Sequence, residues 1–294
     1  MEKRATGIAD LDQVTRGGLP AGQTTLVLGQ AASGKTVLGL QVLAQSVARG
    51  EGAIFVSFEE SPAQIRRDAA SFTWGDALLE SSGFEVIDAR PAVDAESAGD
   101  FDLEGLLAIV TATASRVGAR WLVFDGIDQL LQYLPDRQVA VNQIRRVELA
   151  CEAQGWTLLL TGKATRERAA PAHLEGIEFL LSACIMLSTT IVNQQLNRSL
   201  RVAKYRGSSH VTDELPMLID DQGIALPYHY SHENHDIETT SERLSLGIPR
   251  LDALLGGGIY RGSSLLISGR PGTAKSTLAG GFAETAAGRG ARTL

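Results

Sequence analysis

The sequence predicts an α/β protein of three layers, with a mainly parallel central sheet, helices on both faces and a C-terminal antiparallel hairpin. Three observations support this fold class. Short apolar runs alternate with stretches of helical periodicity, a glycine-rich loop joins an early apolar run to a helix, and the opening of the chain recurs near its end. Strand–helix alternation of this kind is typical of a parallel sheet with right-handed crossovers.

Five apolar runs have the near-continuous hydrophobicity of strands buried on both faces of a sheet. They cover residues 24–29, 53–58, 84–89, 121–125 and 156–162. Between them, apolar residues recur at the 3.6-residue spacing of helices that pack on such a sheet. These helices are expected at residues 35–50, 103–118 and 138–154.

The pattern changes towards residue 200, where two extended stretches, 183–193 and 198–207, flank the turn-forming segment NQQLN. Two such stretches around a short polar turn predict an antiparallel hairpin. We expect this hairpin at the edge of the sheet.

An internal repeat organises the chain. Residues 6–22 (TGIADLDQVTRGGLPAG) align without a gap with residues 246–262 (LGIPRLDALLGGGIYRG), at an offset of 240 residues. We therefore expect one domain at 1–226, a linker at 227–243 and the start of a second copy at 244–294. Because the second copy reaches only the counterpart of Ile54, we expect a fragment or shortened form of a longer tandem protein.

The expected linker is polar, and His229, His232 and His235 recur in it at every third position. That spacing is compatible with a metal site or with a solvated loop. We favour the loop, because nothing nearby in the sequence would orient metal ligands.

Composition excludes several classes of protein. A 44% hydrophobic content is too high for a disordered chain, and no apolar run approaches the ~18–20 residues that a bilayer requires. The start, MEKRATGIADLD, lacks the apolar stretch of a secretory signal. A formal charge of −7 argues against a dedicated nucleic-acid binder. We expect a cytoplasmic protein without membrane contact, in which Cys151 and Cys184 are small buried thiols.

The strongest chemical signal is GQAASGKT, which matches G-x-x-x-x-G-K-[ST] between an expected strand and an expected helix. Its small residues let backbone N–H groups turn towards phosphate oxygens, and the helix N-terminus adds partial positive charge. Lys35 is expected to reach the β- and γ-phosphates and Thr36 to bind Mg²⁺; the alternative is a glycine-rich turn with a stray lysine. The predicted phosphate-binding residues are Gly29, Gln30, Ala31, Ala32, Ser33, Gly34, Lys35 and Thr36.

Acidic residues follow two of the expected strands. Asp125 ends the run WLVFD, at the strand end that faces ligands in open α/β sheets, and is predicted to hold Mg²⁺, with Asp128 as the alternative. Glu59 and Glu60 follow strand 53–58, which we expect close to strand 24–29. A carboxylate there could orient and deprotonate an attacking water, so Glu59, Glu60 and Lys35 are the predicted catalytic residues. Two solvated acids at a strand end are the alternative.

The segment RVAKYRGSSH carries a further candidate. On a strand, Lys204 and Arg206 project to one face and Tyr205 to the other. Such a cationic face could reach the nucleotide of a neighbouring subunit, with His210 as a further phosphate contact. An exposed basic face is the alternative, and the residues alone do not separate the two.

A second glycine-rich loop, GRPGTAKS, lies in the second copy. Ala274 stands where the pattern has glycine, so close backbone approach to phosphate is less certain there than in the first loop. No counterpart of Glu59 or Asp125 follows, so we expect no hydrolysis at this copy. Its predicted phosphate-binding residues are Gly269, Gly272, Thr273, Ala274, Lys275, Ser276 and Thr277.

Taken together, these segments resemble the KaiC family of RecA-superfamily ATPases. The resemblance rests on TGIADLDQVTRGGLPAG, GQAASGKT, FVSFEES, WLVFD and VAKYRGSSH followed by LIDDQGI. It implies a RecA-like P-loop NTPase fold with ATP and Mg²⁺ as cofactors. Family members form hexameric double rings with ATP between protomers, and often autophosphorylate Ser and Thr in the second domain. Those sites lie beyond the residues of this chain.

The resemblance also implies roles for single residues. Glu59 and Glu60 match the catalytic glutamates and Asp125 the Walker-B acid. Lys204, Arg206 and His210 match residues that contact ATP across the subunit interface, and Asp221 matches a residue near the adenine. The segment TGKATRER (161–168) departs from the family, because Lys163 stands where an acid is frequent.

We carry three functional hypotheses from the sequence. The first is a Mg²⁺-dependent ATPase that forms a homo-oligomeric ring and acts as a timing or signalling switch, with regulatory protein partners. The second is a RecA/RadA-like DNA-dependent ATPase, against which the acidic charge stands. The third is a non-catalytic scaffold that uses ATP to stabilise its subunit interfaces.

Overall fold

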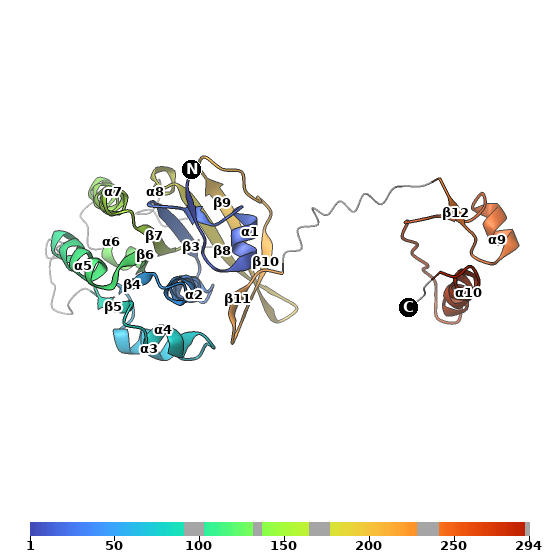
Figure 1. Ribbon diagram of the computed structural model, residues 1–294, viewed down its shortest axis with the longest axis horizontal. Coiled ribbons are helices and arrows are strands. Elements are labelled where there is room, and N and C mark those ends of the chain that lie inside the picture. Colours follow the sequence, from blue (N-terminus) through green and yellow to red (C-terminus); the bar gives the residue numbers. More distant parts are fainter. Residues whose placement is uncertain (91–102, 132–136, 165–176, 228–240, 292–294) are drawn as a thin grey trace. The chain divides into compact units, whose positions relative to one another are not determined.

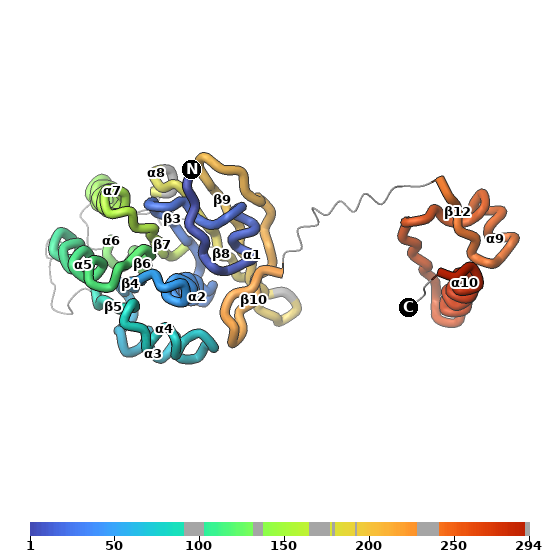
Figure 2. Tube along the Cα trace, in the orientation of Figure 1, coloured from blue at the N-terminus to red at the C-terminus, as the bar shows by residue number. Residues whose placement is uncertain are grey.

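The computed structural model describes residues 1–90, 103–131, 137–164, 177–227 and 241–291. The chain divides into two compact units, Met1–Tyr228 and His229–Leu294. Figures 1 and 2 show the path of the chain through each of them. The three histidines of the expected linker and the segment 165–168 lie outside the described residues.

The described part of the first unit contains a nine-stranded sheet with the order β11-β10-β9-β8-β3-β7-β6-β4-β5. Strands β3 to β8 of this sheet run parallel to their neighbours, whereas β8–β9, β9–β10 and β10–β11 pair antiparallel. The strands are β3 (Thr24–Gly29), β4 (Gly52–Ser57), β5 (Phe84–Asp88), β6 (Ala119–Asp125), β7 (Thr157–Lys163), β8 (Ala183–Val192), β9 (Gln195–Tyr205), β10 (Leu215–Asp220) and β11 (Gly223–Ala225). The predicted parallel sheet and antiparallel hairpin are confirmed.

Helices cover both faces of this sheet, as Figure 1 shows. On one face, α1 (Ala9–Val14), α2 (Lys35–Ala48), α3 (Pro62–Ala69) and α4 (Gly75–Leu79) pack through one apolar cluster. On the other, α5 (Leu103–Val117), α6 (Ile127–Leu131), α7 (Arg137–Gln154) and α8 (Ile177–Leu180) pack through a second cluster. Three predicted helices correspond to α2, α5 and α7, and the three-layer α/β class is confirmed.

Strand residues divide between the two clusters by the two-residue period of a strand. Val27 and Phe55 belong to the cluster beneath α2, whereas Leu26 and Ile54 belong to the cluster beneath α5 and α7. All four side chains are completely buried. Burial on both faces explains why the sequence shows continuous apolar runs here rather than alternation.

Two details of the predicted sheet are wrong. The β8–β9 hairpin does not form the edge, because β10 and β11 extend the sheet beyond β9. Strand β4 does not lie beside β3, because β7 and β6 separate them. The carboxyl end of β4 still meets that of β6, since the backbone N–H of Phe58 donates to the carbonyl of Asp125 at 3.0 Å.

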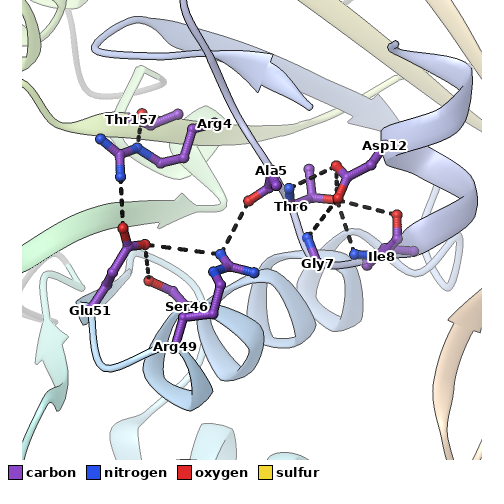
Figure 3. Close-up of polar contacts among 10 residues, drawn as sticks. All are labelled: Arg4, Ala5, Thr6, Gly7, Ile8, Asp12, Ser46, Arg49, Glu51 and Thr157. Carbon is purple, nitrogen blue, oxygen red and sulfur yellow. Dashed lines mark hydrogen bonds and ion pairs between the residues drawn. The ribbon is translucent and has the colours of Figure 1, made fainter. Parts of the chain in front are cut away.

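A polar network fixes the N-terminal segment to the rest of the first unit (Figure 3). Arg4, in β1 (Lys3–Arg4), pairs with Glu51 at 3.1 Å and donates to the hydroxyl of Thr157 at 3.1 Å. Asp12 accepts from the backbone N–H and the hydroxyl of Thr6, both at 2.7 Å. The segment before α1 is thereby held against β7 and the end of α2, while β1 pairs with β2 (Leu19–Pro20).

The second unit repeats four of the first five opening elements of the first unit at the same offset; residues 264–269, the counterparts of β3, form no strand. Strand β12 (Arg243–Leu244), α9 (Pro249–Leu254), β13 (Ile259–Tyr260) and α10 (Lys275–Gly288) lie 240 residues after β1, α1, β2 and α2. Asp252, the counterpart of Asp12, accepts from the hydroxyl of Ser245 and the N–H of Leu246, at 2.6 and 2.7 Å. Among the described residues, no helix has the length and apolar character needed to cross a membrane.

Candidate nucleotide-binding site

The glycine-rich loop lies between β3 and α2, at the carboxyl edge of the sheet. The Lys35 side chain folds back over the loop and donates to the carbonyls of Gly29 and Gln30, both at 2.9 Å. Burial lowers the pKa of Lys35, although Asp125, Asp128 and Glu59 act in the opposite direction. The loop therefore holds a partly desolvated cation at its centre, as a phosphate-binding loop requires.

Gly34 closes the loop in a conformation that only glycine adopts easily. Its φ is +99°, and an added Cβ would lie 2.6 Å from Cδ1 of Ile219 in β10. Ala32 also has a positive φ, of 59°. These left-handed positions turn the chain sharply before α2 begins at Lys35.

Asp125 forms the centre of a buried polar cluster. One carboxylate oxygen accepts from the Thr36 hydroxyl at 3.0 Å and the other from the Thr161 hydroxyl at 2.6 Å. The N–H of Gly126 donates to Thr161, so that hydroxyl is oriented towards the carboxylate. Burial raises the pKa of Asp125, against the hydrogen bonds from Thr161 and Thr36 and the charge of Lys35.

These donors fit a magnesium ion. A hydroxyl and a carboxylate are the hard oxygen ligands that Mg²⁺ prefers, and it commonly takes its remaining ligands from water and phosphate. A carboxyl group that is 4% exposed is unfavourable as a charge without a cation beside it. No group of three or more His, Cys, Asp or Glu side chains among the described residues could hold a metal by itself.

The two glutamates after β4 differ in their surroundings. Glu59 pairs with the ammonium of Lys163 at 2.7 Å, and its side chain is 43% exposed. Glu60 is held through its backbone by the Ser57 hydroxyl, and burial, followed by its interaction with Asp68, raises the pKa of its carboxyl group. The sequence pattern predicts the same role for both glutamates, whereas the structure, over the residues that it describes, shows an ion pair for Glu59 and none for Glu60.

Asp128, the alternative metal residue, has a different environment from Asp125. It lies on α6, is 2% exposed, and accepts from the backbone N–H of Lys163 at 3.0 Å. Its other oxygen lies 3.8 Å from the Lys163 ammonium. The structure thus places Asp128 against the end of β7, while Asp125 contacts Thr36.

Sequence reasoning missed the hydroxyl of Thr161 and the placement of Lys163. Both lie on β7, which is inserted between β3 and β6. A threonine inside the apolar run 156–162 was the available signal for Thr161. Lys163 was noticed only as a departure from the family pattern.

Lys204, Arg206 and His210 lie far from the glycine-rich loop of their own chain. Tyr205 pairs with Ala183, and Ala183 with Thr25, so the end of β9 lies at the amino edge of the sheet. The length of β3 separates the two edges by about 16 Å. Both Lys204 and Arg206 interact electrostatically with Glu148 on α7. Tyr205 is instead buried on the other face of the sheet, in the apolar cluster that holds α1 to α4.

Lys204 and Arg206 share one face and Tyr205 lies on the other, as predicted, with one correction. Strand β9 ends at Tyr205, so Arg206 lies just beyond the strand, where its N–H donates to the carbonyl of Ser182 at 2.8 Å. His210 lies beside the Tyr205 ring, with centroids 5.9 Å apart. A cavity of about 490 Å³ opens at this edge, lined by Glu148, Arg145, Glu152, Leu149, Ser182 and residues 21–24.

Asp221 lies at the other edge, in the turn between β10 and β11. Its carbonyl accepts from the N–H of Thr73 at 2.9 Å. A cavity of about 540 Å³ lies along β9 and β10, lined in part by Met217, Ile219 and Arg198. Because Arg198 donates to the carbonyl of Ala32 at 3.2 Å, this cavity adjoins the glycine-rich loop.

The second glycine-rich loop has the same local form as the first. Helix α10 begins at Lys275, whose ammonium donates to the carbonyl of Arg270 at 2.8 Å. Ala274 takes a φ of 59°. Leu266, which precedes the loop, is 90% exposed, whereas its counterpart Leu26 is completely buried in β3. The two loops therefore differ most in what surrounds them.

Comparison with known proteins identifies a family that this chain resembles over most of its length. The model of the KaiC ATPase family matches residues 4–229 and 244–294. The chain is 37% identical over 297 residues to the circadian clock protein KaiC2 of Synechocystis sp., covering 99% of this chain and 52% of that protein. It is 32% identical over 289 residues to the circadian clock oscillator protein KaiC of Parasynechococcus marenigrum, covering 97% of this chain and 56% of that protein.

The chain thus spans about half the length of the curated relatives that it matches. The family match extends over both units and includes both glycine-rich loops. The chain belongs to the KaiC ATPase family.

Proposed function

We propose that the first unit binds MgATP in the loop from Gly29 to Thr36 and hydrolyses it. The observation that carries this proposal is the contact between Thr36 and Asp125 beside the Lys35 ammonium. Backbone N–H groups of the loop would hold the phosphates, with Lys35 on the β- and γ-phosphates. Thr36 and Asp125 would hold Mg²⁺, which offsets the charge that develops on the phosphates.

Glu59 and Glu60 are the proposed bases for the attacking water. Both carboxylates interact electrostatically with Asp125 or with one another, so they lie on the same side of the site. The raised pKa of Glu60 suits proton uptake, and the exposure of Glu59 allows its carboxylate to turn towards a water. One of the two orients the water while the other accepts its proton.

The nucleotide is proposed to lie between subunits of a ring, for which the family suggests six. The support is the position of Lys204, Arg206 and His210 at the edge of the sheet opposite their own loop, with the two edges about 16 Å apart along β3. Cations at that edge can reach the phosphates of a neighbouring subunit but not those of their own chain. The adenine is proposed to lie near Asp221 and the cavity along β9 and β10, next to the loop.

Turnover assays test the enzymatic part of the proposal. Wild-type protein should release phosphate from MgATP, whereas Lys35→Ala and the double variant Glu59→Gln/Glu60→Gln should not. Equal phosphate release from all three proteins would rule out hydrolysis at this site.

A mixing experiment tests the contribution of the neighbouring subunit. Lys35→Ala and Arg206→Ala should each be inactive alone. In rings assembled from equal amounts of both, about one interface in four combines an intact loop with an intact Arg206, so roughly a quarter of wild-type turnover should return. No recovery in rings shown to be mixed would place Arg206 outside the neighbour's site.

The second unit is proposed to bind phosphate through residues Gly269 to Thr277. The support is the shared local form of its loop and helix α10.

The biological role is proposed to be that of a ring-forming timing or signalling ATPase in the cytoplasm, with regulatory protein partners. The domains are proposed at 1–226 and 244–294, joined by a linker at 227–243. A DNA-dependent ATPase would show turnover stimulated by single-stranded DNA at physiological salt. A non-catalytic scaffold would show the same ring lifetime with ATP and with a non-hydrolysable analogue.

A further inference from the structure

Lys163 lies in the proposed nucleotide site, but the proposed hydrolysis mechanism gives it no role. It is the last residue of β7, and its Cα is paired with that of Gly29, the first residue of the glycine-rich loop. Neighbouring strands lie about 4.8 Å apart, so the Lys163 side chain starts beside the loop. Its ammonium interacts with the charges of Glu59, Asp128 and Asp125, and the Lys163 charge acts in turn on Lys35.

The two ends of this side chain are held very differently. At the backbone, Lys163 donates to the carboxylate of Asp128, which is 2% exposed. At the tip, its ammonium pairs with Glu59, but the side chains of that pair are 38% and 43% exposed. An ion pair as open to water as this one contributes little and exchanges readily, whereas the buried anchor stays in place. The ammonium also lies 3.8 Å from the second oxygen of Asp128, so Lys163 is fixed at its base and can exchange Glu59 for another partner while it stays close to Asp128.

The charges around the loop favour such an exchange. Glu59, Asp125 and Asp128 outnumber Lys35 and Lys163. A triphosphate brings four negative charges and its Mg²⁺ returns two, so MgATP raises the negative charge near Lys163 further. A phosphate oxygen competes well with a solvated carboxylate for an ammonium, since charge-assisted hydrogen bonds are strongest in partly desolvated sites.

We propose that Lys163 contacts the terminal phosphate of a bound triphosphate and leaves Glu59 when it does so. The proposal rests on nucleotide binding at the glycine-rich loop, as proposed above. Lys163 then has two effects. It makes the site prefer a triphosphate to a diphosphate, and it keeps Glu59 paired until a triphosphate has arrived. Asp128 acts as the positioning residue that anchors Lys163.

Nucleotide affinity tests this without relying on turnover. All proteins carry Lys275→Ala, so that the measured binding comes from the first glycine-rich loop. Calorimetry then gives the Kd of MgADP and the Kd of a non-hydrolysable ATP analogue with Mg²⁺. Lys163→Met should weaken analogue binding by about tenfold or more and change MgADP binding by less than about twofold. Lys163→Arg, the matched control, should retain the preference.

The exchange of Glu59 for phosphate also predicts a variant that binds the analogue more tightly, the opposite of the effect of Lys163→Met. Glu59→Gln removes the carboxylate that competes for Lys163, so analogue binding should tighten by about threefold while MgADP binding stays the same. In the double variant Glu59→Gln/Lys163→Met, that gain should disappear. Thermal unfolding of each protein without nucleotide controls for misfolding.

Four outcomes test the proposal. Lys163→Met with unchanged affinity for both nucleotides would overturn the proposal, as would an equal loss for both, which a merely structural role predicts. A gain from Glu59→Gln that persists without Lys163 would overturn the exchange. If the Lys275→Ala parent binds neither nucleotide, the proposed function itself fails, which is a different result from a failure confined to the Lys163 variants.

Discussion

Replacing Gly34 by alanine tests the geometry of the glycine-rich loop. Two penalties arise from the structure. Alanine in a left-handed conformation costs about 1–2 kcal/mol, of which about 0.4–1 kcal/mol is offset because alanine has less freedom in the unfolded chain. The added methyl group would also lie 2.6 Å from Cδ1 of Ile219, which must move off its rotamer at about 0.5–1.5 kcal/mol. The free energy of unfolding should therefore fall by about 0.5–3 kcal/mol.

Thermal unfolding followed by circular dichroism measures this loss. At about 2–4 °C per kcal/mol for a chain of this size, Gly34→Ala should lower the Tm by roughly 1–12 °C. Gly50→Ala is the matched control, because Gly50 has a φ of +78° and no atom within 4 Å of the added Cβ. Gly50→Ala should therefore show the backbone penalty alone.

A third variant isolates the contact. Ile219→Val deletes the Cδ1 atom that the new methyl group meets, so the double variant Gly34→Ala/Ile219→Val should be more stable than the sum of the single losses predicts. Strict additivity, together with equal losses for Gly34→Ala and Gly50→Ala, would refute the argument that Ile219 restricts this position.

Three further predictions concern other parts of the first unit. Burial raises the pKa of Cys151 to about 12, so a thiol reagent at pH 8 should modify neither it nor the buried Cys184 until guanidinium unfolds the chain. Because that pKa is raised, the associated stability is present below about pH 9 and should decline as the pH rises towards 12, which denaturation midpoints at several pH values will show. Asp12→Ala leaves the donors of Thr6 unpaired and should lower the free energy of unfolding by about 2–3 kcal/mol, with a smaller loss for Asp12→Asn. Arg206→Ala should leave nucleotide affinity of the isolated protomer within about twofold of wild type; a collapse of affinity there would contradict the assignment to a neighbouring subunit.

Much of the fold could be predicted from the sequence, because strands that are buried on both faces of a sheet appear as continuous apolar runs. The run 24–29 corresponds exactly in extent to β3, and the helix that follows begins where the motif places it. The sheet order was not accessible, since the insertion of β7 and β6 between β3 and β4 is a long-range event without a local signal. Strand β11 was missed because it is only three residues long and lies at the edge of the sheet. Strand β10 was missed because its buried and exposed residues alternate, so it lacks the continuous apolar run of the central strands.

Part of the candidate site could likewise be predicted from local motifs, whereas the rest depends on the order of the strands. Lys35, Thr36 and Asp125 follow from local motifs, because backbone geometry and strand ends determine where such residues lie. The contacts of Thr161 and Lys163 depend instead on which strand lies beside β6 and β3. The parity of β9 predicted the shared side of Lys204 and Arg206, but only the register with β8 shows that this side lies at the edge opposite the loop.

The central claim is that a triphosphate binds against the backbone between Gly29 and Thr36, and calorimetry of MgATP binding tests it most directly. With Lys275→Ala in both proteins to silence the second loop, the parent should bind one MgATP per chain, and adding Lys35→Ala should remove that binding while leaving the thermal unfolding transition in place. Absence of a binding signal from well-folded parent protein, or equal binding by both proteins, would contradict the account.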